Sequence, residues 1–183
     1  VRGGQRVDGS GLCGCDEGLV MLTQERVREL FDYNPETGDL IRRVSKANQP
    51  AGSIAGSVNA KGHLNVQVDG KLYAAHRLVF LYHHGWLPQE IDHENRIKTD
   101  NRIENLRPAT SSQNKGNIEL LRNNSSGYRG VSRNARSGKW HAQIKIHGKQ
   151  TYLGRADTPE QAAVIYNKAA VEHFGEFAYL NDV

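Results

Sequence analysis

Hydrophobic residues near the start of the chain follow the spacing of one helical face. These positions are Leu22, Val27, Leu30 and Phe31. Their spacing predicts a short helix over residues 22–31, with Thr23 as its N-cap. Turn-forming residues follow at 34–38, and the chain is expected to return as a strand over residues 39–43.

Farther along the chain, hydrophobic residues first follow the spacing of a strand and then that of a helix. Apolar and polar residues alternate over 64–68, and Asp69-Gly70 directly after them is typical of a tight hairpin turn. A hydrophobic stripe over residues 78–82 predicts a buried helix that ends at Gly85. Residues 51–60 are rich in small side chains and fit either a strand or a loop.

Three histidines accompany this second helix: His76, His83 and His84. Metal sites in proteins combine ligands from a small set of residue types at characteristic spacings. No carboxylate or cysteine stands at such a spacing beside these histidines. We therefore interpret them as residues of the helix surface and its interfaces.

Residues 91–117 gather a carboxylate, an imidazole and several amides in one polar segment. Its short hydrophobic runs predict a strand, a long loop, a second strand and a helix. Candidate N-caps of that helix are Thr110 and Ser111, and candidate first residues are Ser112 and Gln113. Either choice places Asn114 in the first turn.

Asp92 and His93 are the chemically most capable neighbours in this segment. A carboxylate is a hard oxygen ligand for a divalent cation, and an imidazole can take a proton from water near neutral pH. Taken alone, the pair also fits a polar loop with a solvated histidine. Together with Asn105 and Asn114, it favours a functional site.

Apolar and polar residues alternate again in the last third of the chain. On one predicted strand the inward residues are Trp140, Ala142, Ile144 and Ile146, and the outward residues are His141, Gln143 and Lys145. On the next strand Thr151 and Leu153 are expected to point inward, and Gln150 and Tyr152 outward. An earlier strand contains the inward Val131, flanked by Arg129 and Arg133.

Three strands are too narrow to form a sandwich, so a helix must cover their apolar face. The sequence predicts this helix after Thr158 as N-cap, with Pro159 at its first position and Gln161 completing a capping box. Its expected buried stripe is Ala163, Tyr166, Ala170 and Phe174. The opposite sheet face is then polar and basic.

Composition and charge limit the class of protein. The chain has 183 residues, a net charge of +4 and a pI of about 9.1. Nine Lys or Arg residues and a single acid, Glu119, lie between residues 115 and 155, which indicates a polyanion-binding surface. No run approaches the ~20 apolar residues of a membrane span, so we expect no membrane association and a cytoplasmic location.

Residues 1–20 contain six glycines and no hydrophobic periodicity. We expect them to be a leader without fixed structure, and the functional protein to begin at Met21. Cys13 and Cys15 form a lone C-x-C pair, from which neither a disulfide framework nor a zinc ribbon can be built.

The polar segment resembles the HNH nucleases of the phage homing endonuclease branch. The resemblance rests on Asp92-His93, the Asn of ENLR (Asn105), the Asn of SSQNKGN (Asn114) and the string DNRIENLR over residues 100–107. It implies a ββα-metal fold with Asp92 and Asn114 as metal ligands and His93 as the general base. Asn105 would brace the loop that presents His93, and the HRLV segment with His76 would support the site. Paired-cysteine zinc variants of the family are excluded by the cysteine count.

Residues 126–181 resemble the APETALA-type (AP2/ERF-like) DNA-binding domain, which is also found attached to phage HNH endonucleases. The markers are YRGV, KWHAQI, YLG, DTPEQAA and a terminal aromatic-Leu-Asn. The implied DNA-contacting positions are Arg129, Gln143, Lys145, Gln150 and Tyr152, to which we add the basic Arg133. Several of these differ from the plant pattern, so the resemblance does not transfer a target sequence.

The expected fold is α+β, a ββα-metal nuclease followed by a three-stranded antiparallel sheet with one helix. The expected domains are a nuclease over residues 21–120, a linker over 121–127 and a DNA-binding domain over 128–183. The expected function is Mg²⁺-dependent hydrolysis of double-stranded DNA, with Mn²⁺ as the alternative ion, by a monomer or weak dimer in a bacterial or phage-infected cell. Alternatives are a DNA-binding regulator with an inactive nuclease domain and a restriction-type enzyme.

Overall fold

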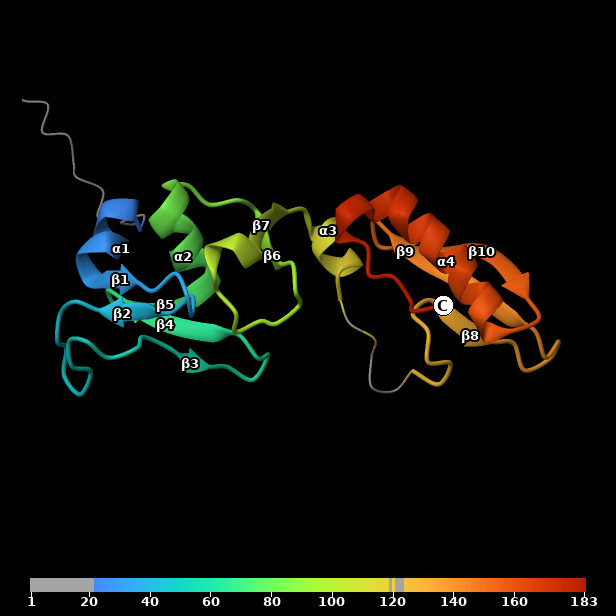
Figure 1. Ribbon diagram of the computed structural model, residues 1–183, viewed down its shortest axis with the longest axis horizontal. Helices are drawn as coiled ribbons and strands as arrows, with labels where there is room; N and C mark the ends of the chain where they lie inside the picture. Colours follow the sequence, from blue (N-terminus) through green and yellow to red (C-terminus); the bar gives the residue numbers. More distant parts are fainter. Residues whose placement is uncertain (1–21, 119, 121–123) are drawn as a thin grey trace, which may run out of the picture.

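The computed structural model describes residues 22–118, 120 and 124–183. The expected leader over residues 1–20 and residues 121–123 of the expected linker lie outside the described residues. Figure 1 shows an elongated molecule in which small sheets and helices form two groups, with helix α3 between them. The expected mixture of helices and sheets is confirmed.

The first group begins with α1 (Gln24–Leu30), β1 (Phe31–Tyr33) and β2 (Leu40–Arg42). Thr23 caps α1 as expected, because its hydroxyl oxygen accepts a hydrogen bond from the Arg26 amide. The helix ends one residue early. Phe31 instead starts a strand that pairs with β2, and this places its ring in the core at 4% exposure.

A three-stranded antiparallel sheet contains β3 (Ser57–Val58), β4 (Leu64–Val68) and β5 (Lys71–Ala74). The expected hairpin turn is confirmed, since Asp69 and Gly70 both have positive φ, of 47° and 82°. Helix α2 (Ala75–His84) follows and ends at Gly85 in the left-handed conformation. Its buried face and β4 build the first core, whose fully buried members include Val27, Val66, Leu78 and Val79.

The polar segment folds in the expected order. Strand β6 (Glu90–His93) pairs antiparallel with β7 (Leu106–Ala109), which follows the short 3₁₀ turn η1 (Ile103–Asn105), and α3 (Ser111–Gly116) comes next. Helix α3 begins one residue before the expected range because Thr110 and Gln113 form a complete capping box.

The second group is an antiparallel sheet of order β10-β9-β8, covered on one face by α4 (Figure 1). Its elements are β8 (Val131–Arg133), β9 (Trp140–Ile146), β10 (Lys149–Ala156), α4 (Pro159–Phe174) and the 3₁₀ turn η2 (Gly175–Phe177). Ala142 and Ile144 are buried under α4, as their alternation predicted. Thr158 caps α4, but Gln161 Oε1 accepts from the Asp157 amide, so the cap differs from the expected box.

Contacts join the two groups at the end of α3. The Arg129 guanidinium donates to the carbonyl oxygens of Lys115 (2.6 Å), Gly116 (2.7 Å) and Ile118. Gly116 packs against Phe174 so closely that an added Cβ would lie 2.8 Å from its ring, which explains a glycine at this helix end. Ala109 of β7 belongs to the core beneath α4. The two groups therefore share packing.

Among the described residues, no helix has the length and apolar character needed to cross a bilayer.

Candidate functional site

A cleft of about 560 Å³ lies where β6 meets α3. Side chains from β6, from α3 and from the loop before β4 face it. Those used below are His63, Glu90, Asp92, His93, Asn114 and Asn117. The strand and the helix thus place the Asp-His pair and the helix amides around one space.

His93 ends β6 and is 6% exposed. Its Nε2 lies 3.1 Å from Oδ1 of the buried Asn101. Because an amide oxygen can only accept, this contact favours the tautomer with the proton on Nε2 and the lone pair on Nδ1. Burial lowers the pKa of His93, while Asn101 and then Asp92 raise it to a smaller extent. The ring is a neutral base with a fixed tautomer.

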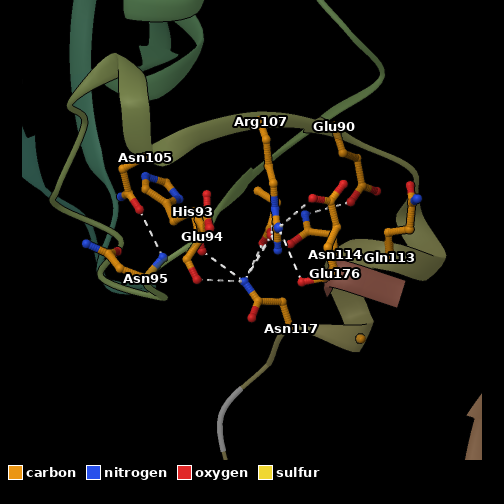
Figure 2. Close-up of polar contacts among 12 residues, drawn as sticks. Glu90, His93, Glu94, Asn95, Asn105, Arg107, Gln113, Asn114, Asn117 and Glu176 are labelled. Atoms are coloured by element: carbon orange, nitrogen blue, oxygen red, sulfur yellow. Dashed lines mark hydrogen bonds and ion pairs between the residues drawn. The ribbon is translucent and has the colours of Figure 1, made fainter. Parts of the chain in front are cut away.

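Asn105 closes the loop that follows His93. Its Oδ1 accepts from the Asn95 amide at 2.9 Å (Figure 2). Its Nδ2 donates to the Asp100 carbonyl at 2.7 Å. The Asp100 carboxylate in turn accepts from Asn95 and Arg102, and the Arg102 guanidinium holds the pKa of Asp100 at about 2. This geometry is what a bracing amide requires, and the role itself stays a prediction.

Asp92 is 4% exposed and has two polar partners. Arg107, directly opposite on β7, donates from Nε and Nη2 to Asp92 Oδ2 at 3.0 and 2.9 Å. Asn117 Nδ2 donates to both carboxylate oxygens, at 3.1 and 2.9 Å, and to the His93 carbonyl at 2.9 Å. Figure 2 shows Asn117 reaching from the end of α3 toward the strand.

Asn114 lines the cleft but does not contact Asp92 in the structure. Its Nδ2 donates to Glu90 Oε2 at 2.8 Å. Glu90 lies on β6, two residues before Asp92. Sequence reasoning missed Glu90, Arg107 and Asn117. Asn117 follows Asn114 by three residues, and that spacing on a helix could have identified a second amide on the same face.

The residues around Asp92 fit a hard divalent cation. Two carboxylates, Asp92 and Glu90, and two amides, Asn114 and Asn117, supply oxygen donors of the kind Mg²⁺ prefers. Each amide carries both an oxygen and an NH₂ group, and a half-turn of the amide exchanges them. The same side chains can therefore donate to a carboxylate or present oxygen to a cation.

His93 also lies close to two other histidines. One ring nitrogen from each of His63, His76 and His93 lies within 4.8 Å of the others, so the described residues include a group that could hold a metal ion. His76 lies on α2 and His63 just before β4. The interpretation of His76 as an interface residue omitted this cluster, because local spacing says nothing about ligands from three separate elements. His83 packs on Tyr33 and His84 on Phe80.

Four of the expected DNA-contacting residues share the sheet face that α4 leaves open. Tyr152 is paired with Gln143, and Gln150 with Lys145, so these side chains are cross-strand neighbours. Tyr152 is 58% exposed and meets His141 edge to face, with ring centroids 5.4 Å apart.

The structure does not bring Arg129 and Arg133 onto that face. The Arg129 guanidinium is directed to α3, and burial lowers its pKa. Arg133 is exposed but pairs with Trp140, so alternation places it on the side that carries α4. Their DNA contacts stay predictions.

A second cavity, of about 910 Å³, lies beside the cleft and shares lining residues with it. It is lined by Lys115 of α3 and by Gln143, Lys145 and Gln150 of the sheet. Ser111, Lys115 and Ile118 line both spaces. A groove with lysines therefore runs from the open sheet face toward His93.

Comparisons with known proteins identify one family model and several relatives. Residues 73–115 match the family described as HNH endonuclease. The uncharacterised HNH endonuclease L560 of Acanthamoeba polyphaga mimivirus is 37% identical over 111 residues, which cover 59% of this chain and 57% of that protein. No solved structure matches the chain significantly.

Plant proteins also match a region of the chain. The AP2-like ethylene-responsive transcription factor TOE2 of Arabidopsis thaliana is 47% identical over 62 residues, covering 34% of this chain and 13% of that protein. The ethylene-responsive transcription factor WRI1 of the same plant is 34% identical over 95 residues, which cover 51% of this chain and 20% of that protein. The chain thus spans between about an eighth and somewhat over half of these relatives.

Proposed function

We propose that this chain, which carries an HNH endonuclease segment over residues 73–115, is a divalent-cation-dependent endonuclease acting on double-stranded DNA. The observation that supports it best is the buried Asp92-His93 pair at an open cleft, with each side chain held by amides. A carboxylate and a neutral imidazole side by side supply a cation ligand and a base.

In this proposal, His93 removes a proton from the water that attacks the phosphorus. Asn101 fixes the proton on Nε2, and Nδ1 then accepts the proton from water. Burial keeps the ring neutral near pH 7, so no proton must first be lost. General-base catalysis of this kind contributes roughly 10²- to 10⁴-fold in rate.

Asp92 and Asn114 are the proposed cation ligands, with Asn117 and Glu90 as neighbours that fit the same oxygen chemistry. A bound divalent cation would neutralise charge on the phosphate oxygens and assist the departing 3′ oxygen. Mg²⁺ is the ion we propose, with Mn²⁺ as the alternative, because the donor set is all oxygen. The β6, β7 and α3 elements would then form the ββα-metal unit, with Asn105 bracing its loop.

The second group is proposed to hold the DNA. Lys145, Gln143, Gln150 and Tyr152 present donors, acceptors and a ring on a sheet that can enter a major groove. Arg96, Lys98 and Lys115 line the cleft, where they can hold phosphates beside His93. Names of the plant relatives, which are transcription factors, support a DNA-reading role.

We further propose a homing-type enzyme of the cytoplasm in a bacterial or phage-infected cell. One site per chain cuts one strand at a time, so a monomer would nick and a weak dimer would break both strands.

The test is a plasmid-nicking assay with the full chain in Mg²⁺, comparing the parent with His93→Ala and the control His84→Ala. We expect His93→Ala to lose at least about 10²-fold in rate, because it removes the base, and to shift DNA in a gel at nearly the parental concentration. His84 is exposed on α2, and His84→Ala should cut normally. Parental cutting by His93→Ala would refute the assignment of the base.

The rival function is a DNA-binding regulator whose nuclease segment is inactive. It predicts that the parent chain binds DNA but does not nick it in Mg²⁺ or Mn²⁺. The amide-held Asp92 and His93 favour the enzyme, since ordering both polar groups inside the protein has a free-energy cost that a pure DNA-binding role does not require.

A further inference from the structure

The three imidazoles beside the cleft form a cluster of their own. The ring centroids of His76 and His93 lie 5.1 Å apart, those of His63 and His76 5.3 Å, and those of His63 and His93 5.8 Å. The three rings come from separate elements, namely the loop before β4, helix α2 and strand β6. The fold therefore brings to His93, the proposed base, two further imidazoles that have no step in the proposed DNA hydrolysis.

The donors suit a different class of cation from the oxygen-lined side. Neutral imidazole binds zinc, cobalt, nickel and copper ions, whereas Mg²⁺ selects oxygen. In a tetrahedral zinc site with bonds of about 2.05 Å, ligand nitrogens lie about 3.4 Å apart. The nitrogens here all lie within 4.8 Å, so side-chain shifts of about 1 Å would complete the geometry.

Two further observations point to a ligand. His63 Nδ1 is buried and has no hydrogen-bond partner among the described residues, and a buried polar atom of this kind is usually satisfied by a partner. His93 Nε2 lies 3.1 Å from Asn101 Oδ1, and a polar partner on one ring nitrogen is what orients histidines at metal sites.

We propose that His63, His76 and His93 bind a transition-metal ion of the zinc class, at a site separate from the Mg²⁺ position beside Asp92. The ion occupies the lone pair of His93, which then cannot accept a proton from water. Zinc is thus an inhibitor of cleavage. This inhibitory half rests on the proposed function, while the binding half does not.

The charges nearby set the expected strength. Burial lowers the pKa of His63, and the charges of Lys98 and Lys61 lower it further and would also oppose a bound cation. Asp92 and Asp100 act on His93 in the opposite sense. We therefore expect a reversible site of moderate affinity, suited to inhibition by changing metal levels.

Binding is tested on the full chain without DNA or Mg²⁺, in a Cys13→Ser, Cys15→Ser background that removes competing thiolates. Zn²⁺ is followed by calorimetry and Co²⁺ by its visible ligand-field absorption. We expect one site per chain, weakened at least about tenfold by His63→Ala and by His63→Gln. The matched control is His83→Ala, which removes another half-buried histidine, outside the cluster.

Equal Zn²⁺ affinity in the parent and both His63 variants would overturn the site. Circular dichroism establishes that each variant is folded, and the two substitutions at His63 guard against a single misfolded protein. Loss of affinity in His83→Ala alone would also overturn it, since the ion would then lie elsewhere.

Inhibition is tested by titrating Zn²⁺ into the nicking reaction at fixed Mg²⁺, with each variant compared with its own zinc-free rate. The zinc midpoint should rise at least about tenfold in His63→Ala. An unchanged midpoint would overturn the inhibitory role. A parent that binds Co²⁺ through imidazoles but never cuts DNA would refute the proposed function and support the metal site.

Discussion

The imidazole of His93 is held by partners that are far apart in the sequence or lie in a long loop. Asn101 fixes its tautomer, Asn117 binds its carbonyl oxygen, and His76 packs against its ring. Asp92 is held in the same way by Arg107. At the scale of single residues, the site consists of amides and imidazoles that orient one another, so its precision depends on the loop over residues 94–105.

Asp100 provides the residue-scale prediction, because it holds that loop together. Its pKa is lowered to about 2 by Arg102, so the folded state binds a proton less readily than the unfolded chain. The stabilisation is therefore present above the unfolded pKa of about 3.9 and is lost as pH falls toward 2. Asp100→Asn should lower the melting temperature by roughly 3 °C at pH 7, with a difference from the parent that shrinks below pH ~4.

The control for this change is Glu104→Gln. Glu104 also lies near Arg102, at 3.1 Å, but its side chain is 72% exposed and its contribution to stability should be small. Thermal melts of the three proteins from pH 7 to pH 3 make the comparison. A constant difference between Asp100→Asn and the parent over that range would contradict the role assigned to the carboxylate.

Helix α3 is the element on which both halves of the molecule depend. It has only six residues, too few to be stable alone, so both of its ends need partners. Thr110 and Gln113 satisfy the first amides, and Arg129 satisfies the last carbonyl oxygens from the other group. A cation at a helix C-terminus also opposes the partial negative charge there.

Arg129→Met is therefore expected to loosen α3. The substitution keeps much of the side-chain volume but removes three donated hydrogen bonds, and we expect a loss of about 2 kcal/mol in the free energy of unfolding. Cleavage should fall as well, because α3 carries Asn114 and Asn117. Urea unfolding and nicking assays measure the two effects.

The competing role of Arg129 as a DNA contact predicts another result. In that case Arg129→Met would unfold at the parental urea concentration and would weaken only DNA binding. Lys168→Met, at an exposed position on α4, is the control for removal of a positive charge.

Elements were predictable where hydrophobic spacing and capping are local. Thr23, Thr110 and Thr158 all cap helices that the pattern predicted, and the Asp69-Gly70 turn is present. The partners of the Asp-His pair were not predictable in the same way. His63 and Asn101 reach His93 only after the strands pair, and local residue spacing does not predict such contacts.

At the scale of the whole molecule, the open sheet face and the cleft belong to one groove. Lys145 lines the cavity beside the cleft and is exposed near the end of β9. Lys145→Ala should weaken DNA binding, and if the amine holds a phosphate, the dependence of log affinity on log salt should flatten by about one unit. Fluorescence anisotropy at several salt concentrations measures this slope.

Lys168→Ala is the matched control, because Lys168 is exposed on α4, away from the open face. It should leave the salt slope nearly unchanged. Equal slopes for the parent and Lys145→Ala would indicate that DNA does not follow this sheet face.

The contacts of Arg107 have a consequence for retargeting such an enzyme by exchanging its C-terminal half. Arg107 pairs with Asp92, but it also stacks on Phe177 with its guanidinium carbon 3.8 Å from the ring centre, and it donates to the Glu176 carbonyl. An exchanged half without an aromatic residue at 177 would leave Arg107, the partner of the proposed cation ligand Asp92, poorly supported. An exchanged C-terminal half should therefore keep the turn Gly175–Phe177, and specificity would be changed at the exposed positions of the sheet.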